Sequence, residues 1–190
     1  MDIREQKKEI RKAIRGIKKE MGEALLLEKS LAVQHNLFKE VDFSPYRTIL
    51  LYYALPDEVN TNMLLSSLSN HLGGDKRIIL PVVSGEILIL KEYIPNEVAN
   101  GYMNILEPQE GESIDPSEIE IAVIPGIAFD SKCNRMGRGK GFYDKLLPHM
   151  ECRTIGLGFD FQIVESIPCE TFDKPLDMVI TESTCYYRPL

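Results

Sequence analysis

Short apolar runs of strand length recur between segments of helical periodicity, and this alternation limits the possible folds more strongly than any other feature of the sequence. The run RTILLYYAL at 47–55 lacks the alternating polar residues of a half-exposed strand, so we predict a strand that is buried on both faces. Further strands are predicted at 77–83, 86–94, 119–126, 153–159 and 177–182. This order of elements indicates a three-layer α/β fold with a mainly parallel sheet flanked by helices.

The predicted helices carry apolar residues at helical spacing. An N-terminal helix has an apolar stripe formed by Ile10, Ile14, Ile17 and Met21. We expect a helix at about 24–41, a loop followed by a helix within 57–72, and a helix at about 141–149. We expect Thr61 to cap the third of these four helices, and residues 95–118, rich in Pro, Gly, Glu and Asn, to form exposed connections. Without a repeat or a clear boundary, residues 1–190 are predicted to form a single domain.

The charge of the chain is unevenly distributed. The net charge is −7, but residues 1–20 hold eight basic and four acidic residues, which leaves −11 for the remaining 170. Lys7 and Arg11 are i,i+4 neighbours on the first helix, close enough to bind one polyanion together. An acidic body would repel a long nucleic-acid backbone while a local positive pocket accepts a small anion. We therefore expect a small phosphorylated ligand and no nucleic acid.

Membrane insertion, secretion and a disulfide or zinc framework are also disfavoured. No apolar run reaches 18 residues, and the N-terminus is polar where a secretory signal would be apolar. The four cysteines, Cys133, Cys152, Cys169 and Cys185, are isolated from one another. Such spacing is typical of reduced thiols in a cytoplasmic protein.

The segment NRMGRGKGFYDKLL at 134–147 places three glycines and four basic residues between a predicted strand and a predicted helix. It is not a Walker A loop, because its Gly-Lys pair is followed by glycine instead of Ser or Thr. Gly137, Gly139 and Gly141 form G-x-G-x-G, whereas the dinucleotide fingerprint is G-x-G-x-x-G. Asp160 lies 19 residues beyond Gly141, as a ribose-binding acid would, so a nicotinamide nucleotide stays a minor alternative.

The same loop has the chemistry of a phosphate site. Glycines let backbone N–H groups approach an anion, and the helix that follows adds its positive end. Arg135, Arg138 and Lys140 supply charge, enough to hold a triphosphate. Asp144 has two interpretations: a first-turn acid that favours the helix dipole, or an oxygen ligand for the Mg²⁺ that accompanies nucleotide phosphates.

Four segments in order resemble the 5-formyltetrahydrofolate cyclo-ligase (methenyltetrahydrofolate synthetase) family. They are KKEIRKAIR at 7–15, LPDEVNT at 55–61, PGIAFDSKCNRMGRGKGFYD at 125–144 and FDKPLDMVITE at 172–182. The resemblance implies a Rossmann-type fold like that of sugar-phosphate isomerases. It also implies ATP-dependent closure of 5-formyltetrahydrofolate to 5,10-methenyltetrahydrofolate, with ADP and phosphate released, Mg²⁺ required and the formyl oxygen phosphorylated on the way.

The resemblance also implies roles for individual residues. ATP-binding positions are Lys7, Arg11, Arg135, Gly137, Arg138, Gly139, Lys140, Gly141, Phe142 and Tyr143, of which Arg138 and Lys140 are catalytic. Folate-binding positions are Tyr53, Glu58, Arg138, Gly139, Lys140, Gly141 and Phe142. The metal ligands are Asp144 and Asp173. The family usually has two tyrosines after the loop, and here the first is Phe142, which loses one hydroxyl group that could bind substrate.

On the residues alone, other interpretations stay open. Tyr53 suits a core equally well, Glu58 a helix start and Asp173 a turn. A sugar-phosphate isomerase would use a carboxylate and a phosphate site without ATP, and a non-catalytic nucleotide- or RNA-binding module would show salt-dependent binding without turnover. The expectation from the resemblance is a cytoplasmic monomer that binds a folate and ATP.

Overall fold

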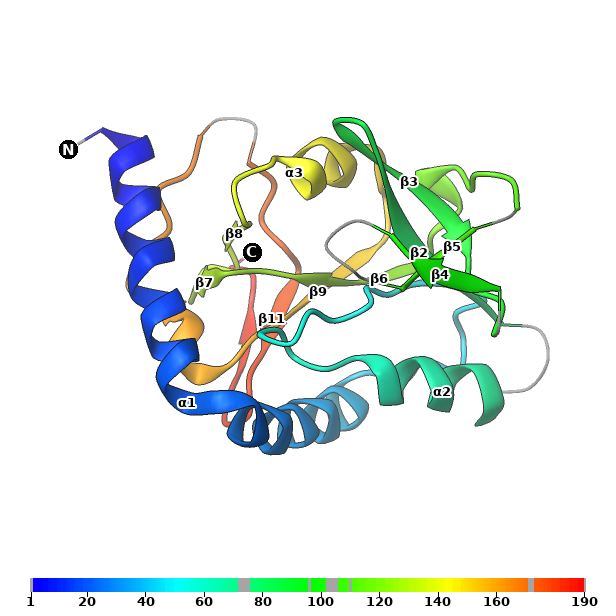
Figure 1. Cartoon of the computed structure of the whole chain (residues 1–190), viewed down its shortest axis with the longest axis horizontal. Helices are drawn as coiled ribbons and strands as arrows, with labels where there is room; N and C mark the ends of the chain where they lie inside the picture. The colour runs from blue at the N-terminus through cyan, green and yellow to red at the C-terminus, as the bar shows by residue number, and fades with distance from the viewer. Residues whose placement is uncertain are drawn as a thin grey trace.

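The computed structural model describes residues 2–71, 76–95, 97–101, 106–109, 111–170 and 173–189, and within these ranges its centre is a seven-stranded sheet (Figure 1). The strand order is β12-β11-β9-β6-β1-β2-β3. The strands are β1 (Thr48–Leu50), β2 (Arg77–Ser84), β3 (Ile87–Glu92), β6 (Ile121–Pro125), β9 (Arg153–Leu157), β11 (Met178–Ile180) and β12 (Cys185–Tyr187). The strands from β11 to β2 are parallel, and β3 and β12 pair antiparallel at the two edges. The predicted mainly parallel α/β sheet is confirmed.

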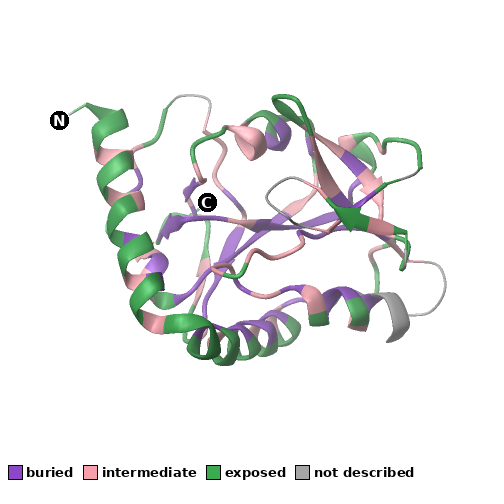
Figure 2. Ribbon diagram, viewed as in Figure 1, coloured by how far each residue is buried: buried purple, intermediate pink, exposed green. Residues whose placement is uncertain are grey.

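The central strands are buried on both faces, as the continuous apolar runs predict. On one face, Ile49 and Leu51 belong to a core shared with α1 (Ile3–Glu40) and α2 (Asn62–His71). On the other face, Leu50 packs in a second core with residues next to α3 (Phe142–Leu146). Figure 2 shows buried residues along the sheet and exposed residues on the outer side of α1. Alternate residues of one short strand therefore serve two cores, which gives the three layers.

The first helix consists of two arms that meet at Gly22, whose φ of 73° and ψ of 164° are not helical. A positive φ favours glycine, so the chain turns here without side-chain strain. The first arm lies beside a small sheet (Figure 1), where Ile14 is buried, and the second arm buries Val33 and Leu37 in the main core. The two helices predicted at the N-terminus are thus present, joined at a kink.

Two smaller sheets accompany the central one. One is formed by β10 (Ile163–Val164), β7 (Ala128–Asp130) and β8 (Arg135–Met136), and the other by β4 (Val98–Asn100) and β5 (Leu106–Pro108). The buried Asp130 carboxylate accepts hydrogen bonds from the N–H groups of Lys132, Asn134 and Ile167. This carboxylate orders the turn that leads into the glycine-rich loop. The remaining elements are 3-10 helices at Pro116–Glu118, Leu147–His149 and Asp160–Gln162.

Some local predictions are wrong. The run at 47–55 forms a strand only over Thr48–Leu50, although the backbones of Arg47 and Leu51 still hydrogen-bond to β2, so the strand is shorter than predicted. Residues 95–118 are not simply exposed connections, since they contain β4, β5 and the buried Glu107. The Thr61 hydroxyl donates to the Tyr52 carbonyl instead of capping α2. In the described part of the chain, no helix is long and apolar enough to cross a membrane.

Candidate active site

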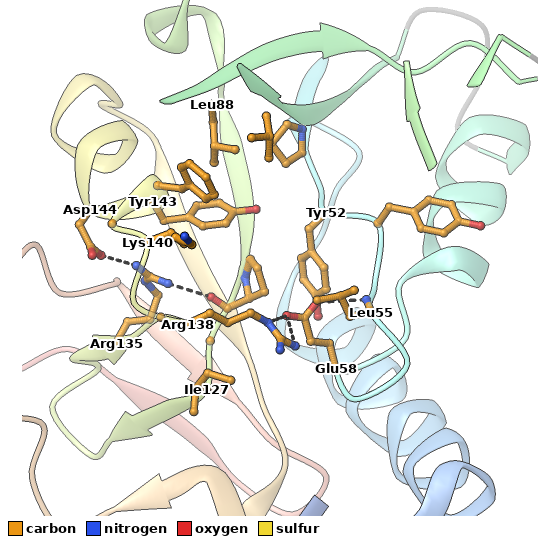
Figure 3. Close-up of a pocket in the computed structure, with 18 of the residues that line it drawn as sticks. Tyr52, Leu55, Glu58, Leu88, Ile127, Arg135, Arg138, Lys140, Tyr143 and Asp144 are labelled. Carbon is orange, nitrogen blue, oxygen red and sulfur yellow. Dashed lines mark hydrogen bonds and ion pairs between the residues drawn. The ribbon is translucent and has the colours of Figure 1, made fainter. Parts of the chain in front are cut away.

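A cavity lies between the segment that follows β1 and the glycine-rich loop (Figure 3). Its volume of about 150 Å³ is roughly ten times what one buried water needs, so part of a small organic ligand fits. The lining residues are Tyr52, Tyr53, Leu55 and Glu58; Pro81, Val83, Leu88 and Glu107; Pro125, Gly126 and Ile127; and Arg135, Gly137, Arg138, Lys140, Gly141, Phe142, Tyr143 and Asp144. The cavity is bordered by the residues that follow β1 and β6, the place where open α/β sheets bind ligands.

The glycine-rich loop takes a shape that requires glycine. Gly139 has a φ of 102° and Gly141 a φ of 71°, a region that L side chains avoid. Arg11 of α1 reaches the loop, and its Nε donates a hydrogen bond to the Gly137 carbonyl at 2.9 Å. The helix that follows has only five residues before a 3-10 turn, shorter than predicted. So short a helix contributes little dipole, and the positive charge near the loop comes mainly from its cationic side chains.

Arg135 lies beneath the loop and is held from three sides. Its Nη1 donates to the Pro125 carbonyl at 3.1 Å, and its Nη2 pairs with Asp144. The guanidinium carbon lies 5.3 Å from the centroid of the Tyr143 ring, a cation–π distance. With only 4% of its side chain exposed, Arg135 connects β6, the loop and α3 as a buried cation.

Arg138 extends from the glycine-rich loop toward the turn after β1 and pairs with two carboxylates (Figure 3 shows its bonds to Glu58). Its Nε and Nη2 donate to Glu58 Oε1 at 3.1 and 3.0 Å, and Nη2 also donates to Asp57. The second Glu58 oxygen accepts the Leu55 N–H at 3.1 Å. This arrangement fixes the turn after β1 to the glycine-rich loop through charge-assisted hydrogen bonds.

Lys18 extends this network from α1, with its Nζ 3.4 Å from Asp57 Oδ2. Burial opposes ionisation of Asp57, but Lys18 and Arg138 outweigh it and lower the pKa of Asp57. Burial of Lys18, together with the nearby Arg138 charge, lowers the pKa of Lys18 although Asp57 favours its charged form. Two cations and two carboxylates therefore share one partly buried cluster.

Two tyrosines stand on opposite walls of the cavity (Figure 3). Burial, with a contribution from the Glu58 charge, raises the pKa of both Tyr52 and Tyr143. Both phenols therefore stay protonated at neutral pH. The Tyr52 hydroxyl donates a hydrogen bond to the Val59 carbonyl at 2.8 Å. Tyr52 therefore holds the segment after β1 in place.

Most of the residues predicted for the site come together, but Lys7, Arg11, Gly139 and Asp173 do not line the cavity. Lys7 Nζ lies 3.1 Å from Asp173 Oδ2 and 3.4 Å from Glu170 Oε2. Burial opposes the charge of Lys7, but these carboxylates raise its pKa. The cationic pair of α1 thus contacts two different segments: Lys7 that of Asp173, and Arg11 the glycine-rich loop.

The two predicted metal ligands, Asp144 and Asp173, are each paired with a cation, Arg135 and Lys7 respectively. Among the described residues, no group of three His, Cys, Asp or Glu side chains is close enough to hold a metal by itself. Mg²⁺ commonly takes one or two protein carboxylates and completes its shell with phosphate oxygens and water. The donor chemistry therefore fits a Mg²⁺ that arrives with a nucleotide.

Sequence reasoning missed several residues of the site. Asp57 stands next to the predicted Glu58, and only the fold shows that both carboxylates bind Arg138. Lys18 looks like one more surface cation of a basic helix, yet 3% of its side chain is exposed. Glu107 lies in a segment whose composition predicted exposure. No local pattern distinguishes these three, because their burial follows from tertiary packing.

Comparison with known proteins places these features in a family. The family model for the 5-formyltetrahydrofolate cyclo-ligase family matches residues 3–182. The 5-formyltetrahydrofolate cyclo-ligase of Escherichia coli (strain K12) is 31% identical over 145 residues, covering 72% of this chain and 78% of that protein. The enzyme of the same name from Haemophilus influenzae is 28% identical over 181 residues, covering 90% and 95%.

Solved structures agree with the sequence relatives. The NMR structure of Aquifex aeolicus 5,10-methenyltetrahydrofolate synthetase superposes with a TM-score of 0.82 at 30% identity and covers 97% of this chain and 95% of its own. The Mycoplasma pneumoniae 5,10-methenyltetrahydrofolate synthetase has the same fold, with a TM-score of 0.75 at 23% identity. The chain therefore belongs to the 5-formyltetrahydrofolate cyclo-ligase family.

Proposed function

We propose that this protein closes the ring of 5-formyltetrahydrofolate to give 5,10-methenyltetrahydrofolate, driven by conversion of ATP to ADP and phosphate. The observation that carries the proposal is one cavity that joins a cationic glycine-rich loop to an aromatic wall. Such a cavity offers a phosphate site and a site for a flat heterocycle side by side. Family membership supports the same reaction.

ATP is proposed to lie along the glycine-rich loop. Backbone N–H groups around Gly137, Gly139 and Gly141 bind phosphate oxygens, and Lys140 at the exposed rim adds a mobile charge. Lys7 and Arg11 bind the nucleotide from α1. A cation about 4 Å from a phosphate near the protein surface is attracted by roughly 4 kcal/mol before desolvation is subtracted. Several such contacts position the γ-phosphoryl group.

The folate is proposed to occupy the aromatic side of the cavity. Tyr53 and Phe142 offer faces for its rings, and Glu58 accepts a hydrogen bond from one of its N–H groups. Glu58 also holds Arg138, so it links substrate binding to a catalytic cation. In place of the usual tyrosine, Phe142 packs without offering a hydroxyl, which weakens substrate binding more than it slows the chemical step.

The formyl group on N5 is an amide, a poor electrophile for the neighbouring N10. Transfer of the γ-phosphoryl group to the formyl oxygen gives an iminophosphate and ADP. N10 then attacks the formyl carbon and loses its proton to solvent, the C–O bond to phosphate breaks, and phosphate leaves with the oxygen. Arg138 and Lys140 stabilise the negative charge that is spread over the transferring group, and the loop holds the reactants in line.

Asp144 and Asp173 would hold Mg²⁺ together with the nucleotide phosphates. When bound, the ion neutralises charge on the phosphate oxygens. Arg135 fixes the Asp144 carboxylate on α3, and Lys7 does the same for Asp173. The carboxylates are therefore oriented before the nucleotide arrives.

We further propose that the chain acts as a single-domain monomer in the cytoplasm on two small-molecule substrates. The free cysteines agree with a reducing compartment, and the acidic surface disfavours nucleic acid.

The experiment is the absorbance of methenyltetrahydrofolate formed from 5-formyltetrahydrofolate, with and without Mg-ATP. The proposal expects turnover only with both, and a loss of at least about 100-fold in a folded Asp144→Ala variant. A matched control is Glu151→Ala, which removes an exposed acid just beyond α3 and leaves turnover unchanged. Absence of turnover in folded wild-type protein would overturn the proposal.

A further inference from the structure

Glu107 is a buried carboxylate in the wall of the cavity that no role accounts for. It lies on β5 and has 7% of its surface exposed. Its Oε1 accepts the Val83 N–H at 3.4 Å, a distance at the weak end of hydrogen bonding. Within the described ranges no basic side chain forms an ion pair with it. Burying a carboxylate that has one weak hydrogen bond and no ion pair is energetically unfavourable, unless a ligand supplies hydrogen-bond donors.

This carboxylate packs closely against its neighbours. A Cβ atom at Gly101 would lie 2.0 Å from Glu107 Oε2, so a larger residue at this position would make the Glu107 side chain move. Val83 and Pro81 of β2 line the same cavity beside it. Side chains that are held in this way lose little entropy when a ligand binds.

Glu58, the other glutamate of the cavity wall, is already occupied. One of its oxygens accepts two bonds from Arg138, and the other accepts the Leu55 N–H. Of these two glutamates, Glu107 has more acceptor capacity to spare. The pterin ring of a folate presents an amino group and a ring N–H side by side, a donor pair that matches two carboxylate oxygens as a guanidinium does.

We propose that Glu107 is a substrate-recognition residue that accepts hydrogen bonds from the amino and ring N–H edge of the pterin, while Glu58 holds Arg138. This inference rests on the proposed function, because it requires a reduced folate in the cavity. It assigns specificity for the pterin to β5, away from the nucleotide loop.

The test measures binding of 5-formyltetrahydrofolate by calorimetry without nucleotide, in wild type and Glu107→Gln. The amide keeps the shape but offers one acceptor and one donor to a pair of donors, so affinity should fall about 10- to 100-fold. Binding of a non-hydrolysable ATP analogue should stay unchanged. Glu112→Gln, an exposed acid of the same segment, is the control and should bind both ligands as wild type does.

A second measurement changes the ligand instead of the protein. Wild type should bind the 2-desamino analogue at least about 10-fold more weakly than the parent folate, whereas Glu107→Gln should show a much smaller difference. An equal loss in both proteins, or wild-type affinity in Glu107→Gln, would overturn the assignment and leave the proposed function standing. If folded wild type binds no reduced folate, both proposals fail.

Discussion

Replacement of Arg138 by alanine tests how the site is held together. The side chain donates three hydrogen bonds to the carboxylates of Asp57 and Glu58. Its loss leaves Glu58 with the Leu55 N–H and Asp57 with Lys18 as their remaining partners. Two carboxylates then lose a cation, and one of them, Glu58, has only 9% of its side chain exposed.

The magnitude follows from these exposures. Hydrogen bonds to charged groups are each worth roughly 1.5–3 kcal/mol when buried. Asp57 is 34% exposed, so water replaces part of what it loses. We expect a destabilisation of about 2 kcal/mol, which lowers Tm by roughly 4–8 °C in a chain of this size. The catalytic loss should be larger, about 100- to 1000-fold in kcat, because a cation is removed from the transferring phosphoryl group.

The assay combines thermal unfolding with steady-state kinetics at saturating Mg-ATP. Arg77→Ala is the matched control, since Arg77 also pairs with two carboxylates, Glu92 and Glu118, but on the surface at 38% exposure. Exposed pairs contribute at most about 1 kcal/mol, and kcat should not change in this variant. If Arg138→Ala kept the wild-type kcat, or lost no more stability than Arg77→Ala, the reasoning about this cluster would be refuted.

Four further variants test other parts of the molecule. Lys7→Ala should raise KM for ATP about 10-fold and leave KM for the folate unchanged, as initial-rate kinetics would show. The pKa of Asp57 is lowered in the folded protein, so the ionised carboxylate stabilises the fold. This contribution to the free energy of unfolding is fully present above the unfolded pKa of about 3.9, and it is lost as the pH falls through the lower folded pKa. Urea unfolding between pH 2 and 6 should be less pH-dependent in Asp57→Asn. In Gly156→Ala the new Cβ would lie 2.7 Å from the Phe129 ring, which should lower the free energy of unfolding in denaturant by about 1–3 kcal/mol. In Gly16→Ala the new Cβ would have nothing within 4 Å, and the change should stabilise α1 by about 0.5–1 kcal/mol.

The sheet was predictable because its strands carry their signal locally. A strand buried on both faces must be apolar throughout, and the runs at 47–55, 119–126 and 153–159 all supply strands of the central sheet. The antiparallel edges and the two small sheets were not predictable, because strands of two or three residues such as Arg135–Met136 are defined by their partners and not by their own sequence.

The site was predictable where the motif is local and unpredictable where it depends on packing. The glycine-rich loop brings Gly137, Arg138 and Asp144 to the cavity edge within a short segment. The pairing of Arg138 with Asp57 spans 81 residues, and that of Lys18 with Asp57 joins a helix to a loop. A sequence records the charges of such groups but not their proximity. The 190-residue single domain and the residue roles implied by the family resemblance stay predictions.

The fate of the formyl oxygen shows whether ring closure proceeds through phosphorylation. We would incubate 5-formyltetrahydrofolate carrying ¹⁸O in its formyl group with the enzyme and Mg-ATP, and analyse the released phosphate by mass spectrometry. If the formyl oxygen is phosphorylated before ring closure, each methenyltetrahydrofolate formed should be matched by one ADP and one phosphate containing ¹⁸O. Release of unlabelled phosphate, or ring closure without ADP, would contradict the account.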